Sequence, residues 1–370
     1  MATLFKRVRR AIATRRSLFE TTGYPTEHEP MAGSSPVVDL EADPVAEAEV
    51  LAERAAALAE QGKPRDAALV ARRVLDLATP DAANCQALGD ILLAGGEEEA
   101  AAAMFRTGLA ADASVPALHI GLCRALRATG RIADALTVAR DAAARFPEEA
   151  APREACGDLE LAQGLIADAE ASFSAGLRIN RRDVACHRGL IEALHRTGRL
   201  DEAATAAREA VALLPGRNGL RSAAVRVLLA QGDLDGAEAM FRDGLARDET
   251  VIGFHLGLAE TLGRARRFED GIAAAERGLS LFPDSLPLLA QLARLQLWAG
   301  RLEAAELRFR AGIGIDPKFP AFAHGLADTL RRQGRLAEAE ALVREAEARF
   351  PGNEAFGTLR ARVEADRLAA

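Results

Sequence analysis

Glycine recurs along this chain at a fixed interval of 34 residues. Eight of the nine points of this lattice carry glycine, and only Arg266 breaks the series. A strict internal period of this length is typical of repeat architectures, in which each unit buries its apolar face against its neighbours. Five residues after each point stands a small residue, which is Gly271 once and alanine otherwise. The lattice glycines are Gly62, Gly96, Gly130, Gly164, Gly198, Gly232, Gly300 and Gly334.

Each 34-residue unit reads as two helices joined by a glycine turn. In one unit, residues 184–197 form the first helix and Gly198 supplies its left-handed C-terminal cap. Asp201 and Glu202 then place negative charge at the positive end of the second helix, and Pro215 ends that helix. Leucines eight and four residues before the glycine form the buried stripe of the first helix. We therefore expect an all-α chain.

A second period of 68 residues lies over the first. Phenylalanine alternates with alanine at one position of the second helix, so large and small side chains take turns in the core. Aromatic residues make up only 4% of the chain, whereas hydrophobic residues make up 49%. Small side chains must therefore fill much of the interior between close-packed helices. The recurring phenylalanines are Phe105, Phe173, Phe241 and Phe309.

At this point the sequence resembles the tetratricopeptide repeat, a family of 34-residue helix-turn-helix units. Counting Gly62 as position 15 places nine repeats at residues 48–353, with small residues at position 8 such as Gly89 and Gly157. The family's early Trp and Tyr are mostly replaced here. The resemblance implies a right-handed superhelical solenoid, and residues 354–370 are expected to form a capping helix. Proline stands at position 32 in five repeats, at Pro147, Pro215, Pro283, Pro317 and Pro351.

The resemblance also implies a concave face lined by first-helix positions 2, 5, 9, 12 and 13. Position 9 carries charges of both signs, and positions 12 and 13 alternate between apolar and basic residues. This pattern favours a groove for an extended or helical segment of another protein. The candidate partner-binding residues are Arg124, Arg127, Leu161, Glu192, Arg196, Arg226, Leu229, Glu260, Arg264, Arg294 and Trp298.

A plainer interpretation stands beside the groove. The charges can be merely solvated and the leucines can belong to the core, as for Leu161 and Leu297, because Glu160 and Gln296 take the usual inward position beside them. Trp298, the only tryptophan, is either an anchor for a partner or buried against the next repeat. The asparagine ladder that some sugar-transferase superhelices carry at position 6 is absent, because glycine stands there in alternate repeats, at Gly121, Gly189, Gly257 and Gly325.

No catalytic, metal or cofactor motif stands out along the chain. His119, His187 and His255 share position 4, but first helices about 10 Å apart keep them too distant to share a zinc ion, so we interpret them as packing residues. The four widely spaced cysteines, all four expected to be free, suggest neither a zinc cluster nor a disulfide framework. Nine repeats without an insertion leave no long loop for a catalytic site. The sequence predicts a protein without catalytic residues, metal or cofactor.

The N-terminal residues 1–19 carry six basic residues and no acid, although the whole chain has a formal charge of −7. On a helical projection the apolar residues fall in one arc and the basic ones opposite. This arm is either an anchor on an anionic membrane or partner, a solvated tail or an organelle transit peptide. Residues 20–47 read as a flexible acidic linker. The candidate anionic-surface residues are Leu4, Phe5, Lys6, Arg7, Val8, Arg9, Arg10 and Ile12.

The leading hypothesis is thus a non-catalytic adaptor that holds other proteins in the groove of a solenoid. The alternative is a peripheral membrane-associated assembly factor anchored by residues 1–19. Nucleic acid is not expected as a partner, because the solenoid is acidic and the groove lacks aromatic stacking platforms. We expect a cytoplasmic protein, in solution or at the inner face of the membrane. The ratio of 44 Arg to 3 Lys hints at a bacterial source, whereas self-association and partner identity stay open.

Overall fold

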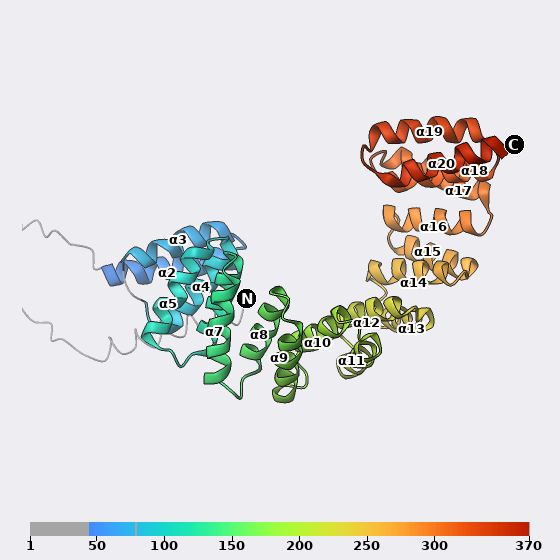
Figure 1. The fold of residues 1–370 in the computed structure, drawn as a ribbon. Coiled ribbons are helices and arrows are strands. Elements are labelled where there is room, and N and C mark those ends of the chain that lie inside the picture. Colours follow the sequence, from blue (N-terminus) through green and yellow to red (C-terminus); the bar gives the residue numbers. More distant parts are fainter. Residues whose placement is uncertain (1–43, 78–79, 370) are drawn as a thin grey trace, which may run out of the picture. The chain divides into compact units, whose positions relative to one another are not determined.

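A computed structural model describes residues 44–77 and 80–369. Within these ranges the chain forms helices and no strand (Figure 1). The basic arm at residues 1–19 and the linker up to residue 43 lie outside the described residues. The helices are α2(Pro44–Glu60), α3(Pro64–Leu77), α4(Ala82–Gly95), α5(Glu98–Ala111), α6(Pro116–Ala128), α7(Ile132–Arg145), α8(Ala150–Ala162), α9(Ile166–Ile179), α10(Val184–Arg196), α11(Leu200–Leu213), α12(Asn218–Gln231), α13(Leu234–Arg247), α14(Ile252–Arg264), α15(Phe268–Leu281), α16(Leu286–Trp298), α17(Leu302–Ile315), α18(Pro320–Arg332), α19(Leu336–Arg349) and α20(Glu354–Ala369).

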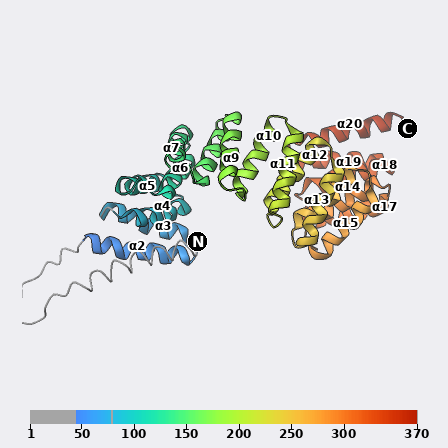
Figure 2. The same cartoon turned by 90° about the horizontal axis from the view of Figure 1, so that it is seen from below.

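The chain divides into two compact units, residues 1–197 and 198–370. In each unit every helix packs against the next one along the chain (Figure 2). The first helices of successive repeats also touch each other. In the N-terminal compact unit these are α4, α6, α8 and α10, and in the C-terminal compact unit they are α14, α16, α18 and α20. The first helices therefore form one layer of each compact unit, and the second helices α3, α5, α7 and α9 or α11, α13, α15, α17 and α19 lie beside it.

The lattice glycines end the first helices as predicted. All eight have positive φ values, between 74° and 82°. Around Gly130 the amide of Arg131 donates to the carbonyl of Leu126 at 2.8 Å, which is the capping pattern of a left-handed C-terminal residue. Arg266 adopts the same conformation, with φ 59°. The turn geometry is therefore kept even where the glycine is missing.

The small residues five positions after each turn are fully buried. Ala169 and Gly271 lie where a second helix crosses its first helix, and a Cβ on Gly271 would stand 3.3 Å from the carbonyl oxygen of Ala259. This close approach of backbones explains why the position admits only small side chains. The other members are Ala67, Ala101, Ala135, Ala203, Ala237, Ala305 and Ala339, each 0% exposed.

The 68-residue period reflects phenylalanine rings that lie between glycines. Phe105 is fully buried, and Cβ atoms on Gly89 and Gly121 would come within 2.6 and 2.3 Å of its ring. Phe173 takes the same place between Gly157 and Gly189. One glycine belongs to the same 34-residue repeat as the phenylalanine, and the other belongs to the following repeat. The ring thus fills the joint between two units, which is why glycine stands at position 6 in alternate repeats.

The two ends of the described region depart slightly from the expected boundaries. Helix α2 begins at Pro44, four residues before the expected start of the first repeat. Helix α20 packs on α18 and α19 with Phe356, Leu359 and Val363, all buried. Leu368, in the last turn of α20, is 90% exposed.

Candidate protein-interaction surface

The first helices of the N-terminal unit border a hollow of about 310 Å³, here called the N-terminal hollow. Its lining comes from α6, α8 and α10, at positions 2, 5, 6, 8, 9, 10 and 12 of their units. The two predicted residues Arg124 and Arg127 lie here, together with Glu154, Asp158 and Arg188. Burial raises the pKa of the Glu154 and Asp158 carboxyls. The hollow therefore presents a mixed surface on which three guanidinium groups surround two half-buried carboxyls.

The charges of this hollow are already paired from one unit to the next. Arg124 donates to Asp90, its counterpart 34 residues earlier, at 3.1 Å. Arg127 lies 3.8 Å from Asp158. Both arginine side chains remain about half exposed. Such exposed pairs contribute little to stability, so a partner that offers its own carboxylates can exchange for them at small cost.

The remaining predicted residues of the N-terminal unit lie at the end of α8 and along α10. Leu161 is half-buried against the core around Phe173, and its carbonyl accepts a hydrogen bond from Arg196 at 3.1 Å. Arg196 also lies 3.9 Å from Glu192. The carboxyl of Glu160 beside Leu161 is buried, with hydrogen bonds from Arg140 and Ser172. Leu161 therefore shares its surface between core and solvent.

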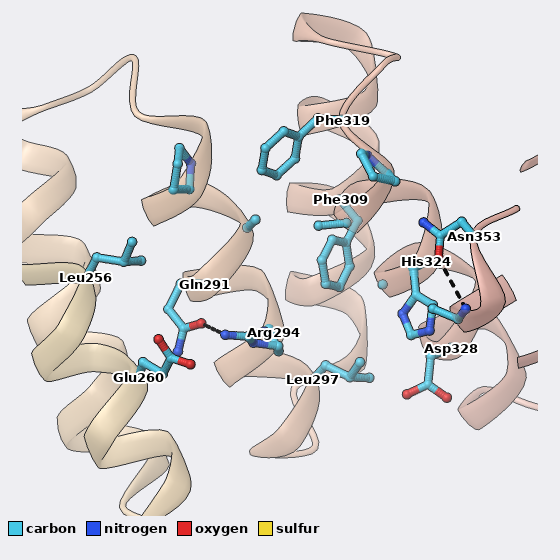
Figure 3. A pocket seen from close by; sticks show the side chains of 16 residues that line it. Leu256, Glu260, Gln291, Arg294, Leu297, Phe309, Phe319, His324, Asp328 and Asn353 are labelled. Atoms are coloured by element: carbon cyan, nitrogen blue, oxygen red, sulfur yellow. Dashed lines mark hydrogen bonds between the residues drawn. The ribbon is translucent and has the colours of Figure 1, made fainter. Parts of the chain in front are cut away.

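The C-terminal unit holds a hollow of about 420 Å³, here called the C-terminal hollow (Figure 3). It lies across α14, α16, α18 and the start of α20. Most of its lining residues stand at repeat positions 2, 5, 6 and 9, and the others are Leu297, Phe309, Phe319, Pro320 and Asn353. Its walls are largely apolar and include Leu256, Pro287 and Phe319, whereas Glu260 and Arg294 supply charge. Gln291 accepts a hydrogen bond from Arg294 (Figure 3), while its own buried Nε2 has no partner among the described residues.

Polar groups gather at the far end of the C-terminal hollow. His324 and Asn353 lie together there, with Asp328 beside them (Figure 3). Burial lowers the pKa of His324, so the imidazole is neutral near pH 7. Asp328 is buried and accepts hydrogen bonds from Arg331 at 2.9 Å and Arg332 at 3.1 Å. An occupant of this hollow would meet an apolar wall first and hydrogen-bonding groups at its end.

The other predicted residues of the C-terminal unit differ in exposure. Arg226, Glu260, Arg264 and Arg294 are exposed, and Leu229 is half-buried. Leu297 is only 3% exposed, so the plainer interpretation holds for this leucine. Its neighbour Gln296 is also buried, and the two side chains share the inward side of α16. Trp298 keeps 37% of its surface exposed.

Residues at position 4 hold the backbone between units. Nε2 of His119 lies 3.1 Å from the carbonyl oxygen six residues earlier, and His187 and His255 repeat this contact at 2.9 Å. Arg221 occupies the same position and donates to the carbonyl of Pro215, also six residues earlier, at 3.1 Å. Arg221 is fully buried and also pairs with Asp243 at 2.6 Å. The histidines thus have a structural partner each.

Neither metal-ligand nor reactive-thiol chemistry is apparent in the part of the chain that the structure describes. No group of three or more His, Cys, Asp or Glu side chains there could hold a metal ion. All four cysteines are free and buried. Burial raises the pKa of Cys85 and Cys156 to about 11 and that of Cys123 to about 12, and it raises the pKa of Cys186 further. These thiols are therefore protonated and shielded at neutral pH.

Both hollows contain residues that the sequence analysis did not select. Glu154, Arg188, Leu256 and His324 stand at position 5, and Pro287 stands at position 2. The same 34-residue count identifies these positions, but the predicted residues all stand at positions 9, 12 and 13. Gln291, at position 6, had no signal in the repeat pattern, because the unit before and the unit after carry glycine there.

Comparisons with known proteins agree with this architecture. Two models described as tetratricopeptide repeat match the chain, one at residues 87–150, 120–183 and 155–218, the other at residues 194–259, 262–323 and 307–363. No curated protein matches the chain. The number of nine repeats stays a prediction, because the matched segments begin at residue 87.

A solved structure shares the fold, and others are similar to a lesser degree. The C-terminal part of a TPR repeat-containing protein from Cytophaga hutchinsonii matches with a TM-score of 0.54 and 12% identity, over 65% of this chain and 98% of that one. A tetratricopeptide repeat protein from Parabacteroides merdae has a TM-score of 0.48, 14% identity and coverage of 66% and 97%. A thermophilic TPR protein from Thermus thermophilus has a TM-score of 0.40, 23% identity and coverage of 49% and 98%.

Proposed function

This chain belongs to the tetratricopeptide repeat family, and from that premise we propose that it is a non-catalytic scaffold whose first-helix surface holds segments of partner proteins. Proteins built from this repeat generally bind other proteins. The observation that carries the proposal is the C-terminal hollow, which joins an apolar wall to hydrogen-bonding groups on one continuous layer of helices. An apolar side chain of a partner would enter it at Leu256 and Phe319, and polar groups of the same partner would meet Arg294 and His324.

The two hollows support binding of a chain segment better than binding of a small molecule. Both are open, and both extend over three or more successive first helices. Pockets for small molecules are concave and enclose most of the ligand surface. An open surface that crosses several parallel helices suits an extended or helical segment, which makes one contact after another along its length. The paired charges at Arg124 and Arg127 would set the register of such a segment.

A matched pair of substitutions tests the proposal. Ala321→Arg places a long charged side chain in the C-terminal hollow, at an exposed position. Ala311→Arg makes the same change at an exposed alanine of α17 that does not line this hollow. Both sites are helical and arginine is a good helix former, so both variants should fold. Equal helicity and equal melting temperature by circular dichroism check this point.

Tagged parent protein, Ala321→Arg and Ala311→Arg are then used to capture partners from the source cells. We expect the parent and Ala311→Arg to retain the same proteins, and Ala321→Arg to lose them. Equal retention by all three proteins would refute binding in the C-terminal hollow. If none of the three retains a protein above a tag-only control, the scaffold function itself is refuted.

Membrane association through residues 1–19 is the second candidate function, and these residues lie outside the described part. None of the described helices is both long enough and apolar enough to span a bilayer. The candidate rests on the charge segregation of the sequence alone. Sedimentation with anionic liposomes tests it, since binding by the full chain that is lost on removal of residues 1–19 supports it and absence of binding by the full chain refutes it.

A further inference from the structure

Trp298 lies at the last residue of α16 and is unusually exposed for its type in this unit. It keeps 37% of its surface accessible, whereas Phe254, Phe309 and Phe322 keep 3% or less. Trp298 is also the only tryptophan of the chain. Tryptophan is enriched among the residues that dominate the binding energy of protein interfaces, so an exposed indole is a candidate anchor for a partner.

The ring of Trp298 is held firmly on its inner side. Its centroid lies 6.2 Å from that of Phe268, and a Cβ on Gly263 would stand 3.2 Å from the Trp298 Cζ3 atom. The Arg294 guanidinium lies 5.2 Å from the ring centroid, which is the geometry of a cation–π contact. The indole is therefore a preorganised platform with a cation over one part of its face, and little side-chain entropy is lost when a partner contacts it.

Two further arginines follow Gly263: Arg264 is the last residue of α14, and Arg266 lies in the turn between α14 and α15. The side chains of Arg264 and Arg266 are exposed, and neither forms an ion pair or hydrogen bond with any residue that the structure describes. Glu260 lies one helical turn before Arg264, but no ion pair joins them. By contrast, Arg267 in the same turn donates to Glu238 at 2.7 Å and to Asp270 at 2.8 Å. The positive charge of Arg264 and Arg266, which follow the residue that contacts Trp298, is therefore not neutralised by the described residues.

The backbone of Arg266 adds an independent observation. Its φ of 59° lies in the left-handed region, where the eight equivalent points of the lattice carry glycine. A side chain with a Cβ is disfavoured in this conformation. Arginine at this point therefore weakens the turn, and its guanidinium gains no partner inside the described fold in return. Strained residues of this kind gather at functional sites.

We propose that Trp298, Arg294, Arg264 and Arg266 form a docking patch for an acidic segment of a partner protein that carries a large apolar residue. The apolar residue packs on the exposed indole, and neighbouring carboxylates pair with the free guanidinium groups of Arg264 and Arg266. The inference rests on the proposed scaffold function, because it assumes a protein partner. It adds the chemistry of that partner and places its anchor at the end of α16, beside the C-terminal hollow with which the patch shares Arg294.

Selection from a displayed library of random 12-residue peptides on the full-length protein tests this chemistry. We expect the enriched peptides to carry Asp or Glu on either side of a Phe, Leu or Ile. A synthetic enriched peptide without tryptophan should change the fluorescence of Trp298 on titration, and the change should saturate. Arg266→Gly should weaken binding of the labelled peptide about threefold, as expected for one exposed charge pair, and Trp298→Ala about tenfold or more.

Arg266→Gly is informative because it restores the residue that the turn prefers, so its weaker binding cannot come from a damaged fold. Arg106→Gln, which removes an exposed charge on α5, is the matched control and should bind like the parent. Enrichment of neutral or basic peptides, or parent-like binding by both Arg266→Gly and Trp298→Ala, would overturn the proposal. Saturable quenching of Trp298 by a polyuridine oligonucleotide in place of acidic peptides would overturn it in favour of nucleic acid. If the patch proposal fails in this way while Ala321→Arg still loses its partners in the capture experiment, the scaffold function stands and only the docking patch is refuted.

Discussion

The ring of Phe173 lies so close to Gly189 that a Cβ on Gly189 would stand 2.2 Å from the Phe173 Cζ atom. Phe173 belongs to α9 and Gly189 to α10, so the contact joins two successive repeats. Gly157 on α8 bounds the ring on its other side. The joint between repeats therefore depends on the absence of a side chain at two positions.

Gly189→Ala should destabilise the protein by about 1–3 kcal/mol, because the added methyl group overpacks a fully buried joint. Urea unfolding followed by circular dichroism measures the change. Gly253→Ala is the control, since nothing lies within 4 Å of a Cβ there and alanine favours the helix. Phe173→Leu puts a smaller side chain at the joint, so it should restore part of the stability that Gly189→Ala loses if the two residues are in contact. Strictly additive losses in the double variant would contradict the contact.

Arg266→Gly should stabilise the C-terminal unit by about 1 kcal/mol, because glycine adopts the left-handed conformation without the Cβ clash. The melting temperature should rise by a few degrees. Gly300→Arg makes the reverse change at an equivalent turn and should lower it by a similar amount. An unchanged or lower stability of Arg266→Gly would mean that the arginine stabilises its turn after all.

Arg221→Ala should lower the free energy of unfolding by about 3 kcal/mol, because it removes a fully buried side chain and its contacts with Asp243 and the Pro215 carbonyl. Arg221→His should lose clearly less, since histidine makes the equivalent carbonyl contact in other repeats. Chemical denaturation of both variants measures this difference. Equal losses would show that the carbonyl contact contributes little and that the lost pairing with Asp243 accounts for the change.

Glu306 should make the stability of the C-terminal unit sensitive to acid. Hydrogen bonds from Gln333, Arg335 and Arg310 lower the pKa of its carboxyl to about 2. In the unfolded chain the pKa of glutamate is about 4.3, so the stabilisation is complete above that pH and is lost as the pH falls towards 2. Urea unfolding between pH 5 and pH 2 should show a shallower decline for Glu306→Gln than for the parent. Parallel declines would contradict the assignment.

Much of the fold is predictable from sequence because its rule is periodic. A turn that needs a left-handed residue every 34 positions marks itself with glycine, and a helix crossing that admits no side chain marks itself with Ala169 and its equivalents. The alternation of Phe173 with alanine also predicted a volume balance. That balance is in fact made with Gly157 and Gly189, whose role is visible only once two repeats are packed together.

The candidate surface was less predictable, because side chains 34 residues apart interact. Arg124 appeared as an available charge in the sequence but pairs with Asp90 of the preceding repeat. Leu297, for which the sequence left groove and core open, is buried beside Gln296, whereas the predicted contact residue Leu229 is half-buried. A single helix projection cannot separate these cases, since the neighbouring repeat decides which side of a first helix stays open.

The most direct test of the account is site-specific photo-crosslinking in source cells. A photoreactive amino acid replaces Ala151 or Ala321, which line the two hollows, or Ala133 or Ala311, which are exposed on α7 and α17 outside them. Binding on the first-helix surface predicts that the same partner proteins are crosslinked from Ala151 or Ala321 and not from Ala133 or Ala311. Crosslinks formed equally from all four positions, or only from Ala133 and Ala311, would contradict binding on the first-helix surface.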